Sequence, residues 1–580
     1  MSYFNIDSIK ERTGATNRRA TDRFDAIVIG TGISGGWAAK ELTGKGLRTL
    51  VLERGRDVKH IADYPTAMKN PWEFPHLGEV PLELKQKSPA SSGHYIFKEP
   101  TLHFVVKDFE HPFVQEKPFS WMRGYQVGGR SLLWARQTQR WSDFDFEGPA
   151  RDGFAVDWPI RYADIAPWYS YVEKFAGISG NKDGLPNLPD GEFLTPHEMS
   201  CVEKHFSQQV AKNYTDRHII IGRTANLTDP KPIHYQQGRA KCQHRVLCER
   251  GCPYGGYFST NASTLPWAER TGKMTLKTHS VVHSIIYDEQ KQRATGVRVI
   301  DANTKEMTEY YAKIIFLNAS ALNSNLILLN STSNRFPNGF GNDSGVLGKY
   351  IGFHNYRGRV SAEYDGFHDT TTEGKRPNGA YVPRFRNVYK QETDFLRGYA
   401  ASMGSSKIGV PTDGLFGEEL KDQLSRPSEE GWSIGANMMG EVLTKESNHV
   451  RLDPNLKDDW GIPQLRMSVD FDDNDMKMVK DFYEQFTEMF TKAGFTNIKT
   501  MDTKRVPGNE NHEMGGIRMG KDPKTSMLNK WNQMHACKNV FVTDGGCMTS
   551  TATQNPSLTY MALTARAVDY AVKEMRKGNL

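Results

Sequence analysis

The sequence predicts an α/β protein that joins a nucleotide-binding domain to a second domain with a mainly antiparallel sheet. Three observations support this prediction: an N-terminal succession of strand, glycine turn, helix and strand; a run of alternating strands in mid-chain; and an aromatic-rich region of short strand-like runs. At 580 residues, the chain is long enough for two large domains.

The nucleotide-binding prediction depends on the first strand and the glycine turn after it. Residues 24–29 form a short apolar run and lead directly into a GxGxxG motif. In this motif Gly30 permits a tight turn, Gly32 lets a pyrophosphate approach the backbone, and Gly35 lets the helix pack closely on the strand. The second strand ends at Glu53, a residue suited to accept hydrogen bonds from a ribose hydroxyl. These residues do not decide between NAD and FAD.

The remaining pattern predicts two further kinds of structure. Residues 281–287, 294–300 and 309–317 alternate apolar and polar positions, as the strands of a meander do. Residues 353–504 contain many short strand-like runs and one amphipathic helix over 473–493. This second region is typical of a separate sheet that faces a substrate.

Composition and charge exclude several classes of protein. The chain has 74 Lys and Arg against 68 Asp and Glu, a net charge of +6 without a basic block, so no nucleic-acid partner is expected. The longest apolar runs fall far short of the about 20 residues that cross a bilayer, so no transmembrane segment is predicted. Residues 1–23 lack the apolar stretch of a signal peptide. We therefore expect a cytoplasmic chain, or a periplasmic one exported together with a signal-bearing partner.

Three of the six cysteines, Cys242, Cys248 and Cys252, lie close together as C-x5-C-x3-C. Soft thiolates at tight spacing, with a proline after the last, are typical of iron–sulfur ligation, and three thiolates suit a 3Fe-4S cluster. The alternatives are zinc, with His244 as a fourth ligand, and three unligated thiols that could pair as a disulfide after export. The other cysteines are expected to be small buried hydrophobic residues: Cys201, Cys537 and Cys547.

Several separated segments together resemble one family, the glucose-methanol-choline (GMC) flavoprotein oxidoreductases. They extend over nearly the whole chain, at residues 30–35, 128–134, 318–329, 450–454, 512–516, 539–546 and 554–559. The resemblance implies FAD rather than NAD, held in a Rossmann-like FAD-binding domain, and a substrate-binding domain inserted between its parts. The implied boundaries are 1–155, 240–352 and 505–580 for the FAD-binding domain, which carries the cysteine loop, and 156–239 and 353–504 for the substrate-binding domain.

The resemblance also assigns residues to the cofactor. Sugar oxidases of this kind can carry a histidine that tethers the flavin where this chain has Leu133, so FAD is expected to bind non-covalently. The expected cofactor-binding residues lie in the glycine turns and next to them, or at the starts and ends of predicted elements. They are Gly30, Gly32, Ile33, Ser34, Gly35, Glu53, Arg54, Arg123, Gly128, Gly129, Ser131, Trp134, Val282, Ala319, Asp544, Gly545, Asn555 and Pro556.

Two residues match the catalytic pair of the family. Oxidation of an alcohol requires that a base remove the hydroxyl proton as hydride leaves the carbon, and a histidine with its ordinary pKa of about 6.5 is largely neutral near pH 7. His512 matches this base, and Asn555 matches the amide that orients the hydroxyl. The alternatives are a structural loop histidine at 512 and a helix N-cap at 555, ahead of a helix that begins at Pro556.

The resemblance thus implies an FAD-dependent dehydrogenase that oxidises a ring hydroxyl of a sugar or glucoside, at C3, to a keto-sugar. Hydride would pass to flavin N5 with His512 as the base, and electrons would leave through the iron–sulfur cluster to cytochrome c or a quinone. A small partner subunit is expected. The alternatives are a gluconate or other sugar-acid 2-dehydrogenase, a pyranose oxidase-like enzyme and, from another class, a non-catalytic flavin-bearing subunit of an electron-transfer assembly.

Overall fold

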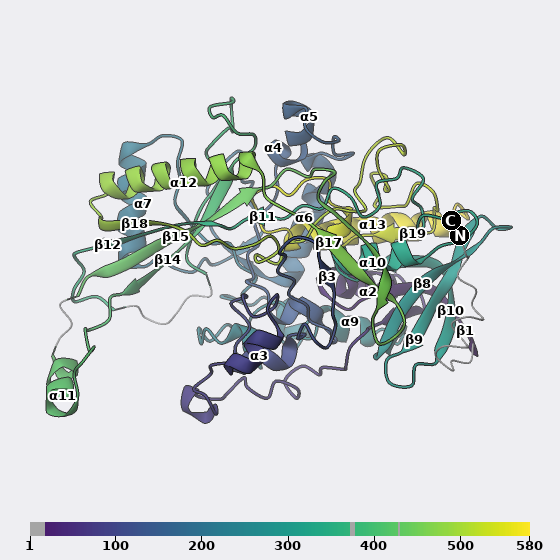
Figure 1. Cartoon of the computed structure of the whole chain (residues 1–580), viewed down its shortest axis with the longest axis horizontal. Coiled ribbons are helices and arrows are strands. Elements are labelled where there is room, and N and C mark those ends of the chain that lie inside the picture. The colour runs from purple at the N-terminus through teal and green to yellow at the C-terminus, as the bar shows by residue number, and fades with distance from the viewer. Residues whose placement is uncertain (1–17, 372–377, 427–429) are drawn as a thin grey trace.

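The computed structural model of the chain describes residues 18–371, 378–426 and 430–580. Residues 1–17 lie outside the described residues. They make up most of the segment that is predicted to lack a signal peptide. Two large sheets lie toward opposite ends of the molecule, with helices around and between them (Figure 1).

The first sheet has seven strands and contains the predicted nucleotide-binding unit. Its order is β7-β2-β1-β10-β9-β8, with β19 beside β10. The pairs β7–β2, β2–β1, β1–β10 and β10–β19 are parallel, whereas β10, β9 and β8 form the antiparallel meander that the sequence predicts. The bounds are β1 (Arg18–Ile29), β2 (Thr49–Leu52), β7 (Met274–Lys277), β8 (Ser280–Asp288), β9 (Arg293–Asp301), β10 (Met307–Leu317) and β19 (Val540–Val542).

Both faces of β1 are buried over residues 26–29, which is why this end of the strand is a continuous apolar run in the sequence. Ile27 and Ile29 pack in one hydrophobic cluster, and Ala26 and Val28 pack in another. Helix α2 (Ile33–Gly44) begins directly after the glycine turn and packs against α13 (Ser557–Arg576). The predicted βαβ unit is therefore confirmed, and the last helix of the chain completes its packing.

The second sheet is antiparallel throughout, as predicted. Its order is β18-β12-β15-β14-β13-β6, with β11 paired to β15. Helix α12 (Asp473–Lys492) lies across one face with α7 (Cys201–Asn213) beside it, and buries an apolar stripe that includes Met478, Phe482 and Phe486 (Figure 1). The bounds are β6 (Ile220–Ile221), β11 (His354–Asn355), β12 (Gly358–Tyr364), β13 (Ala380–Val382), β14 (Tyr399–Lys407), β15 (Trp432–Glu441) and β18 (Thr496–Asp502).

Strand β6 comes from the predicted segment 156–239, whereas the other strands of the second sheet come from 353–504. This agrees with a discontinuous second domain, although the boundaries themselves stay a prediction. Two smaller sheets are formed by β16 (His449–Lys457), β17 (Pro463–Ser468) and β3 (Val114–Gln115), and by β4 (Ile178–Ser179) and β5 (Phe193–Leu194).

The remaining helices are mostly short. Helix α10 follows β10 as the sequence predicts, and α11 lies on a segment that projects from the body (Figure 1). The α-helix bounds are α3 (Leu82–Lys87), α4 (Asp143–Phe146), α5 (Gly148–Asp152), α6 (Tyr162–Ala176), α8 (Pro232–Gln236), α9 (Thr264–Glu269), α10 (Ala321–Asn330) and α11 (Gly417–Ser425). The 3-10 helices are η1 (Pro71–Glu73), η2 (Glu99–Phe104), η3 (Gly129–Leu132), η4 (Cys248–Arg250) and η5 (Gly545–Cys547).

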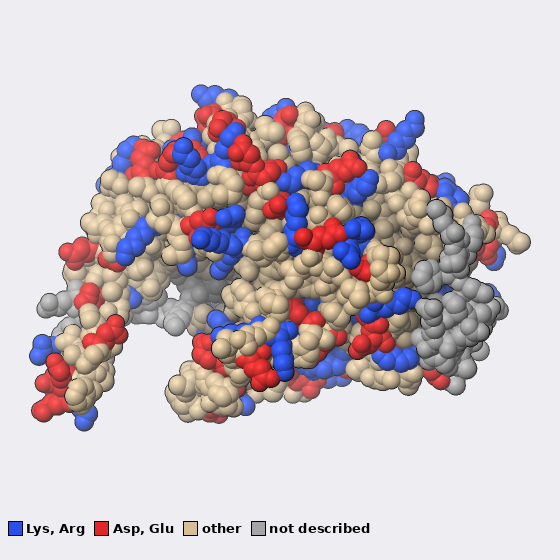
Figure 2. All heavy atoms as spheres, in the orientation of Figure 1, with Lys and Arg blue, Asp and Glu red and all other residues tan. Residues whose placement is uncertain are grey.

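The surface mixes both signs of charge. Acidic and basic side chains alternate over the face shown in Figure 2. Among the described residues, no helix combines the length and the apolar character needed to cross a membrane.

Candidate active site

A cavity of about 650 Å³ begins at the carboxyl ends of β1 and β2 and reaches residues of the second sheet. Ile29 and Leu52 line it from the first sheet, and Ser402 and Asn437 line it from the second. Ligand pockets commonly measure about 300–1,000 Å³, and the carboxyl ends of parallel strands are where α/β folds bind nucleotides. The cavity therefore joins a nucleotide site to a substrate-sized space.

The glycine turn has the geometry that its sequence predicts. Gly30 has a φ of +100°, and a Cβ on it would lie 2.4 Å from the backbone oxygen of Asn318. No atom lies within 4 Å of a Cβ built on Gly32, and no side chain caps the helix that begins after it. The free N–H groups of the first turn of α2 are therefore available to phosphate.

Glu53 lies at the end of β2 and lines the cavity. Its carboxylate accepts hydrogen bonds from the Thr31 hydroxyl and from the Gly55 backbone N–H, the latter at 3.0 Å. Burial raises the pKa of Glu53, and these hydrogen bonds oppose that effect. The glycine turn thus holds the predicted ribose acceptor in place, and its role toward a ribose stays a prediction.

Most of the predicted cofactor-binding residues line this one cavity. They are Gly30, Gly32, Ile33, Ser34, Glu53, Arg54, Arg123, Gly129, Ser131, Trp134, Val282, Ala319, Asp544, Gly545, Asn555 and Pro556. Segments that are hundreds of residues apart in sequence therefore meet around it.

Gly35 and Gly128 were predicted to bind the cofactor and do not line the cavity. A Cβ on Gly35 would lie 2.0 Å from the backbone oxygen of Gly30, and one on Gly128 would lie 1.7 Å from Oδ1 of Asn261. These two glycines permit close packing behind the cavity wall, which is the role that the motif analysis gives Gly35. They shape the site without touching its contents.

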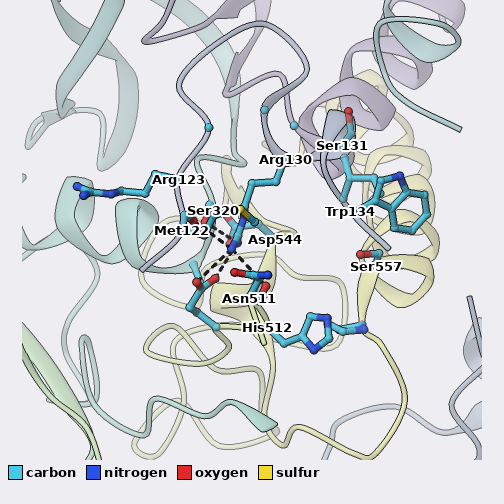
Figure 3. A pocket seen from close by; sticks show the side chains of 18 of the residues that line it. Met122, Arg123, Arg130, Ser131, Trp134, Ser320, Asn511, His512, Asp544 and Ser557 are labelled. Carbon is cyan, nitrogen blue, oxygen red and sulfur yellow. Dashed lines mark hydrogen bonds and ion pairs between the residues drawn. The ribbon is translucent and has the colours of Figure 1, made fainter. Parts of the chain in front are cut away.

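Two predicted arginines line the cavity with their guanidinium groups engaged by the protein. Arg54 stacks between the rings of Tyr125 and Trp460, with its guanidinium carbon 4.7 and 4.8 Å from the ring centres. Arg123 pairs with Asp108 at 3.3 Å, and its side chain points away from Arg130 (Figure 3). A ligand in the cavity would therefore meet the aliphatic or backbone atoms of Arg54 and Arg123, because their guanidinium groups are already engaged.

Arg130 joins the second glycine turn to the loop that carries His512. Its guanidinium makes a forked pair with the buried Glu513, at 2.7 and 3.1 Å, and donates to Ser320 Oγ and to the Asn511 backbone oxygen, both at 3.2 Å (Figure 3). Forked charge-assisted bonds fix direction as well as distance. The His512 loop is therefore held in a fixed position relative to the glycine turns.

His512 and Asn555 meet at the wall of the cavity. Nδ2 of Asn555 lies 3.2 Å from Nε2 of His512, and both residues line the cavity. The other ring nitrogen of His512, Nδ1, lies 2.9 Å from Nδ1 of His354 on β11. The structure thus brings together the predicted pair and adds a second histidine.

Burial controls the protonation of this group. It holds the pKa of His512 well below its ordinary value, with His354 and Arg130 as smaller causes in the same direction. Burial also lowers the pKa of His354 to about 4 and raises the pKa of Glu510, which lines the cavity, to about 8. Near pH 7 both imidazoles are therefore neutral, and Glu510 keeps its proton.

Asn555 does not cap a helix, contrary to the alternative reading of its sequence. The N-cap of α13 is Pro556, and no side chain caps that end. The amide of Asn555 bonds to His512 instead, while Pro556, Ser557 and Tyr560 at the start of α13 line the cavity. The start of α13 therefore borders the site as expected, and the Asn555 side chain belongs to the site because it does not cap the helix.

Sequence reasoning missed three residues of the site: His354, Arg130 and Glu513. Arg130 and Glu513 lie inside motifs that were recognised, where a charged residue next to a glycine run was the available signal. His354 had no such signal, because it lies on β11 of the second sheet, far from His512 in sequence, and only the tertiary structure brings the two rings together.

The cysteine loop does not form the predicted ligand set. Within the described part of the chain, no group of three or more His, Cys, Asp or Glu side chains is arranged to hold a metal ion. All six cysteines are free thiols, and Cys242, Cys248 and Cys252 are half-buried. Of the cysteines expected in the core, Cys537 and Cys547 are buried, whereas Cys201 is only half-buried.

The loop nevertheless lies next to the cavity. Helix η4, which begins at Cys248, packs against η3 of the second glycine turn, and Glu249 lines the cavity. Burial raises the pKa of Cys242 and Cys248, and the charge of Arg136, another cavity residue, opposes it. The loop is therefore close to the candidate site without the geometry of a metal centre.

The chain matches family models described as GMC oxidoreductase at residues 24–352 and 444–564. It is 27% identical over 576 residues to 2-methyl-1,2-propanediol dehydrogenase from Mycolicibacterium austroafricanum, covering 95% of each chain. It is 25% identical to the fructose dehydrogenase large subunit from Gluconobacter japonicus, covering 96% of this chain and 98% of the relative. It is 24% identical to the gluconate 2-dehydrogenase flavoprotein from Pantoea cypripedii, covering 95% and 94%.

The longer match spans more than half of the chain, and the two matches include both glycine turns, His512 and Asn555. The cavity offers what an FAD-binding member needs: an uncapped helix start, an acidic residue at the end of β2, and a histidine beside an amide. The chain therefore belongs to the GMC oxidoreductase family of flavoproteins, which act on hydroxyl groups of sugars and other alcohols.

Proposed function

We propose that the chain is an FAD-dependent dehydrogenase that oxidises the C3 hydroxyl of a sugar or glucoside to a keto-sugar. The observation that carries this proposal is the His512–Asn555 pair, 3.2 Å apart, at the wall of the cavity that also contains the GxGxxG turn. A base and an amide at this place serve an alcohol oxidation, because the hydroxyl must lose its proton as the carbon loses hydride.

FAD, when bound, supplies the hydride acceptor. The residues of the chain act on the hydroxyl: as the C–H electron pair leaves and the C=O bond forms, Nε2 of His512 takes the O–H proton. Asn555 donates a hydrogen bond and orients the substrate oxygen without titrating. The lowered pKa of His512 keeps its ring neutral and able to accept a proton near pH 7.

The polar lining of the cavity supports a substrate rich in hydroxyl groups. Gln137, Asn378, Asn437 and Asn509 contribute amides that can both donate and accept. The names of two relatives also specify a sugar or a sugar acid as substrate. Gln137, Asn378 and Asn509 each make one hydrogen bond within the protein, which leaves the other atoms of their amides to pair with substrate hydroxyl groups.

One observation favours a second candidate, a sugar-acid 2-dehydrogenase. Six arginines line the cavity, against four other acidic residues and a Glu510 that burial keeps protonated near pH 7. They are Arg54, Arg123, Arg130, Arg136, Arg359 and Arg505, against Glu53, Glu249, Glu513 and Asp544. The lining is therefore net positive, which suits a substrate with a carboxylate such as gluconate.

The FAD-loaded enzyme should be assayed with an artificial electron acceptor on methyl glucosides, methyl 3-deoxyglucoside, fructose and gluconate. Turnover of methyl glucosides with a 3-keto product, identified by NMR, and no turnover of the 3-deoxy compound is the expected result. Faster turnover of gluconate would favour the second candidate. Formation of hydrogen peroxide with oxygen as the sole acceptor would indicate an oxidase. If no substrate led to reduction of the artificial acceptor, the result would favour a non-catalytic flavin-bearing subunit.

We propose that the cysteine loop binds an iron–sulfur cluster through which electrons would leave the enzyme. Because the loop has three thiols, we propose a 3Fe-4S cluster. The spacing of Cys242, Cys248 and Cys252 and the packing of η4 against the second glycine turn support this. The thiols do not stand as ligands in this structure, so no step of the reaction is derived through such a cluster. Iron and acid-labile sulfide in the purified protein are the expected result, whereas zinc alone or no metal would overturn this part.

The proposal includes partners. A small subunit and a cytochrome c or quinone acceptor would complete the assembly, and the small subunit would carry the chain to the periplasm. The printed name of one relative, a large subunit, supports an assembly of this kind. Co-expression with neighbouring reading frames followed by fractionation tests it: a chain recovered alone from the cytoplasm would contradict the periplasmic assembly.

A further inference from the structure

A histidine base works only if the nitrogen that faces the substrate lacks a proton. A neutral imidazole has two tautomers, and the partner of the far nitrogen decides which one is present. In this chain the far nitrogen of His512 is Nδ1, and its partner is His354. The contacts of His354 therefore determine whether His512 can act.

The first contact fixes the proton on His354. Its Nε2 lies 3.1 Å from the backbone oxygens of both Thr551 and Ala552. Carbonyl oxygens only accept hydrogen bonds, so Nε2 of His354 carries the hydrogen. Ala552 is fully buried with a φ of +54°, a left-handed conformation that costs an alanine energy and is kept only where the surrounding structure imposes it.

The second contact passes this preference on to His512. His354 is fully buried and neutral, so its Nδ1 holds a lone pair and can only accept. The Nδ1 of His512, 2.9 Å away, must then be the donor. This leaves Nε2 of His512 unprotonated, and the Asn555 amide nitrogen that lies 3.2 Å from it donates to that lone pair.

The charged groups around His354 do not reverse this assignment. Glu510 accepts a hydrogen bond from the His354 backbone N–H at 3.2 Å and is protonated near pH 7, because burial raises its pKa to about 8. Glu441, opposite His354 on β15, is engaged by Arg384 at 3.2 Å and Arg397 at 2.7 Å. No free carboxylate among these neighbours therefore draws a proton onto the His354 ring.

We propose that His354 is a positioning residue that holds His512 in the tautomer with hydrogen on Nδ1 and a lone pair on Nε2. His354 does not line the cavity, so it acts through His512 and not on the substrate. The relay runs from the carbonyls of residues 551 and 552 through His354 to His512. This inference rests on the proposed role of His512 as the base.

Two variants of His354 separate the relay from packing. In His354→Asn, Oδ1 takes the place of ring Nδ1 and can still accept the hydrogen of His512. His354→Leu keeps a similar volume and removes the acceptor. Substrate-dependent flavin reduction in the FAD-loaded enzyme should fall by about 10–100-fold in the leucine variant, the usual loss when the partner behind a working histidine is removed. The asparagine variant should recover most of that rate, with the substrate Kd changed less than threefold in both.

A second readout does not use activity. In protein labelled with ¹⁵N-histidine, the His512 signals, assigned by their absence from His512→Ala, should show a protonated Nδ1 in the wild type and in His354→Asn. In His354→Leu they should show mainly the tautomer with hydrogen on Nε2, in keeping with the expected loss of rate. FAD content and thermal midpoints should be measured for all variants, so that a folding defect is recognised.

A double-mutant cycle separates this inference from the proposed function. If His354 acts through His512, then His354→Leu should cost nothing further in a His512→Ala background. Equal losses in the leucine and asparagine variants, or a full additional loss in the His512→Ala background, would overturn the positioning role. A His512→Ala enzyme at the wild-type rate would instead overturn the base, which is the proposed function itself.

Discussion

The imidazole site and the cysteine loop are both regions where the sequence suggested chemistry, and they turned out differently. His512 and Asn555 lie on separate C-terminal segments, yet their side chains meet at 3.2 Å. Cys242, Cys248 and Cys252 are close neighbours in sequence, yet they do not form a ligand group in the described structure. The comparison teaches that closeness along the chain does not by itself arrange side chains into a ready site, because a ready site needs groups that the fold already holds in position.

The two regions also differ in what holds them. The His512 loop is held by the Arg130–Glu513 pair at 2.7 Å and by a second imidazole at 2.9 Å. The cysteine loop is held by the side chains of Arg245 and Arg250, which donate to the backbone oxygens of Ala67 and Lys69, while its thiols remain half-buried. We therefore expect the imidazole site to be assembled without any ligand and the cysteine loop to depend on one.

Replacing the base should have the largest effect. In His512→Ala the rate of substrate-dependent flavin reduction should fall by about 10²–10⁴-fold, the usual contribution of a general base, while FAD content stays unchanged. Stopped-flow absorbance of the flavin measures this rate. His449→Ala, a histidine on β16 outside the cavity, is the matched control. A rate within threefold of the wild type would contradict the assembled imidazole site.

The cysteine loop should respond in the opposite way. Cys248→Ser should lower the iron content by more than half, while substrate-dependent flavin reduction stays within about twofold, because Cys248 does not line the cavity. Cys201→Ser, on α7, is the control. Flavin reduction that falls as far as in His512→Ala would show that the two regions are not separate.

A smaller loss of activity is expected when the amide of Asn555 is removed. Asn555→Leu removes the hydrogen bond to His512 that the free protein makes, and the proposed one to the substrate oxygen that would replace it, and leaves the proton acceptor in place. The loss of about one hydrogen bond predicts a decrease of roughly 10-fold in flavin reduction. Full activity would mean that the contact is incidental, and a loss equal to that of His512→Ala would mean that the two residues act as one unit.

The smallest effect concerns stability and pH. Burial raises the pKa of Glu510 to about 8 from an ordinary value of 4.5. The stability this carboxyl contributes by staying protonated is therefore full below about pH 4.5 and is lost as pH rises through about 8. Glu510→Gln keeps a neutral side chain, so its thermal midpoint should exceed that of the wild type by about 1–3 °C at pH 9 and not at pH 5.

Differential scanning calorimetry of the FAD-loaded proteins across this pH range measures that difference. Glu446→Gln is the control, because Glu446 is an exposed carboxyl whose pKa is lowered by Lys349. A constant difference between the Glu510 variant and the wild type at all pH values would contradict a protonated Glu510 beside His354.

Much of the site could be predicted because its parts are local patterns. The glycine turn, the strand end at Glu53 and the helix start near Pro556 each follow from a few consecutive residues, and the structure places all of them on one cavity. The N-cap alternative for Asn555 was wrong for a related reason: local preference allowed a cap, but the contact with His512 engages the amide.

The sequence by itself determined the strands, the amphipathic helices and the glycine turns, because hydrophobic period and backbone freedom are properties of neighbouring residues. Only the tertiary structure decided that β11 brings His354 against His512, that Arg130 pairs with Glu513, and that the three thiols of the loop are not arranged as a ligand group. These are contacts between segments far apart in sequence or details of side-chain direction. Their energies depend on burial and geometry that exist only once both sheets have packed around the cavity.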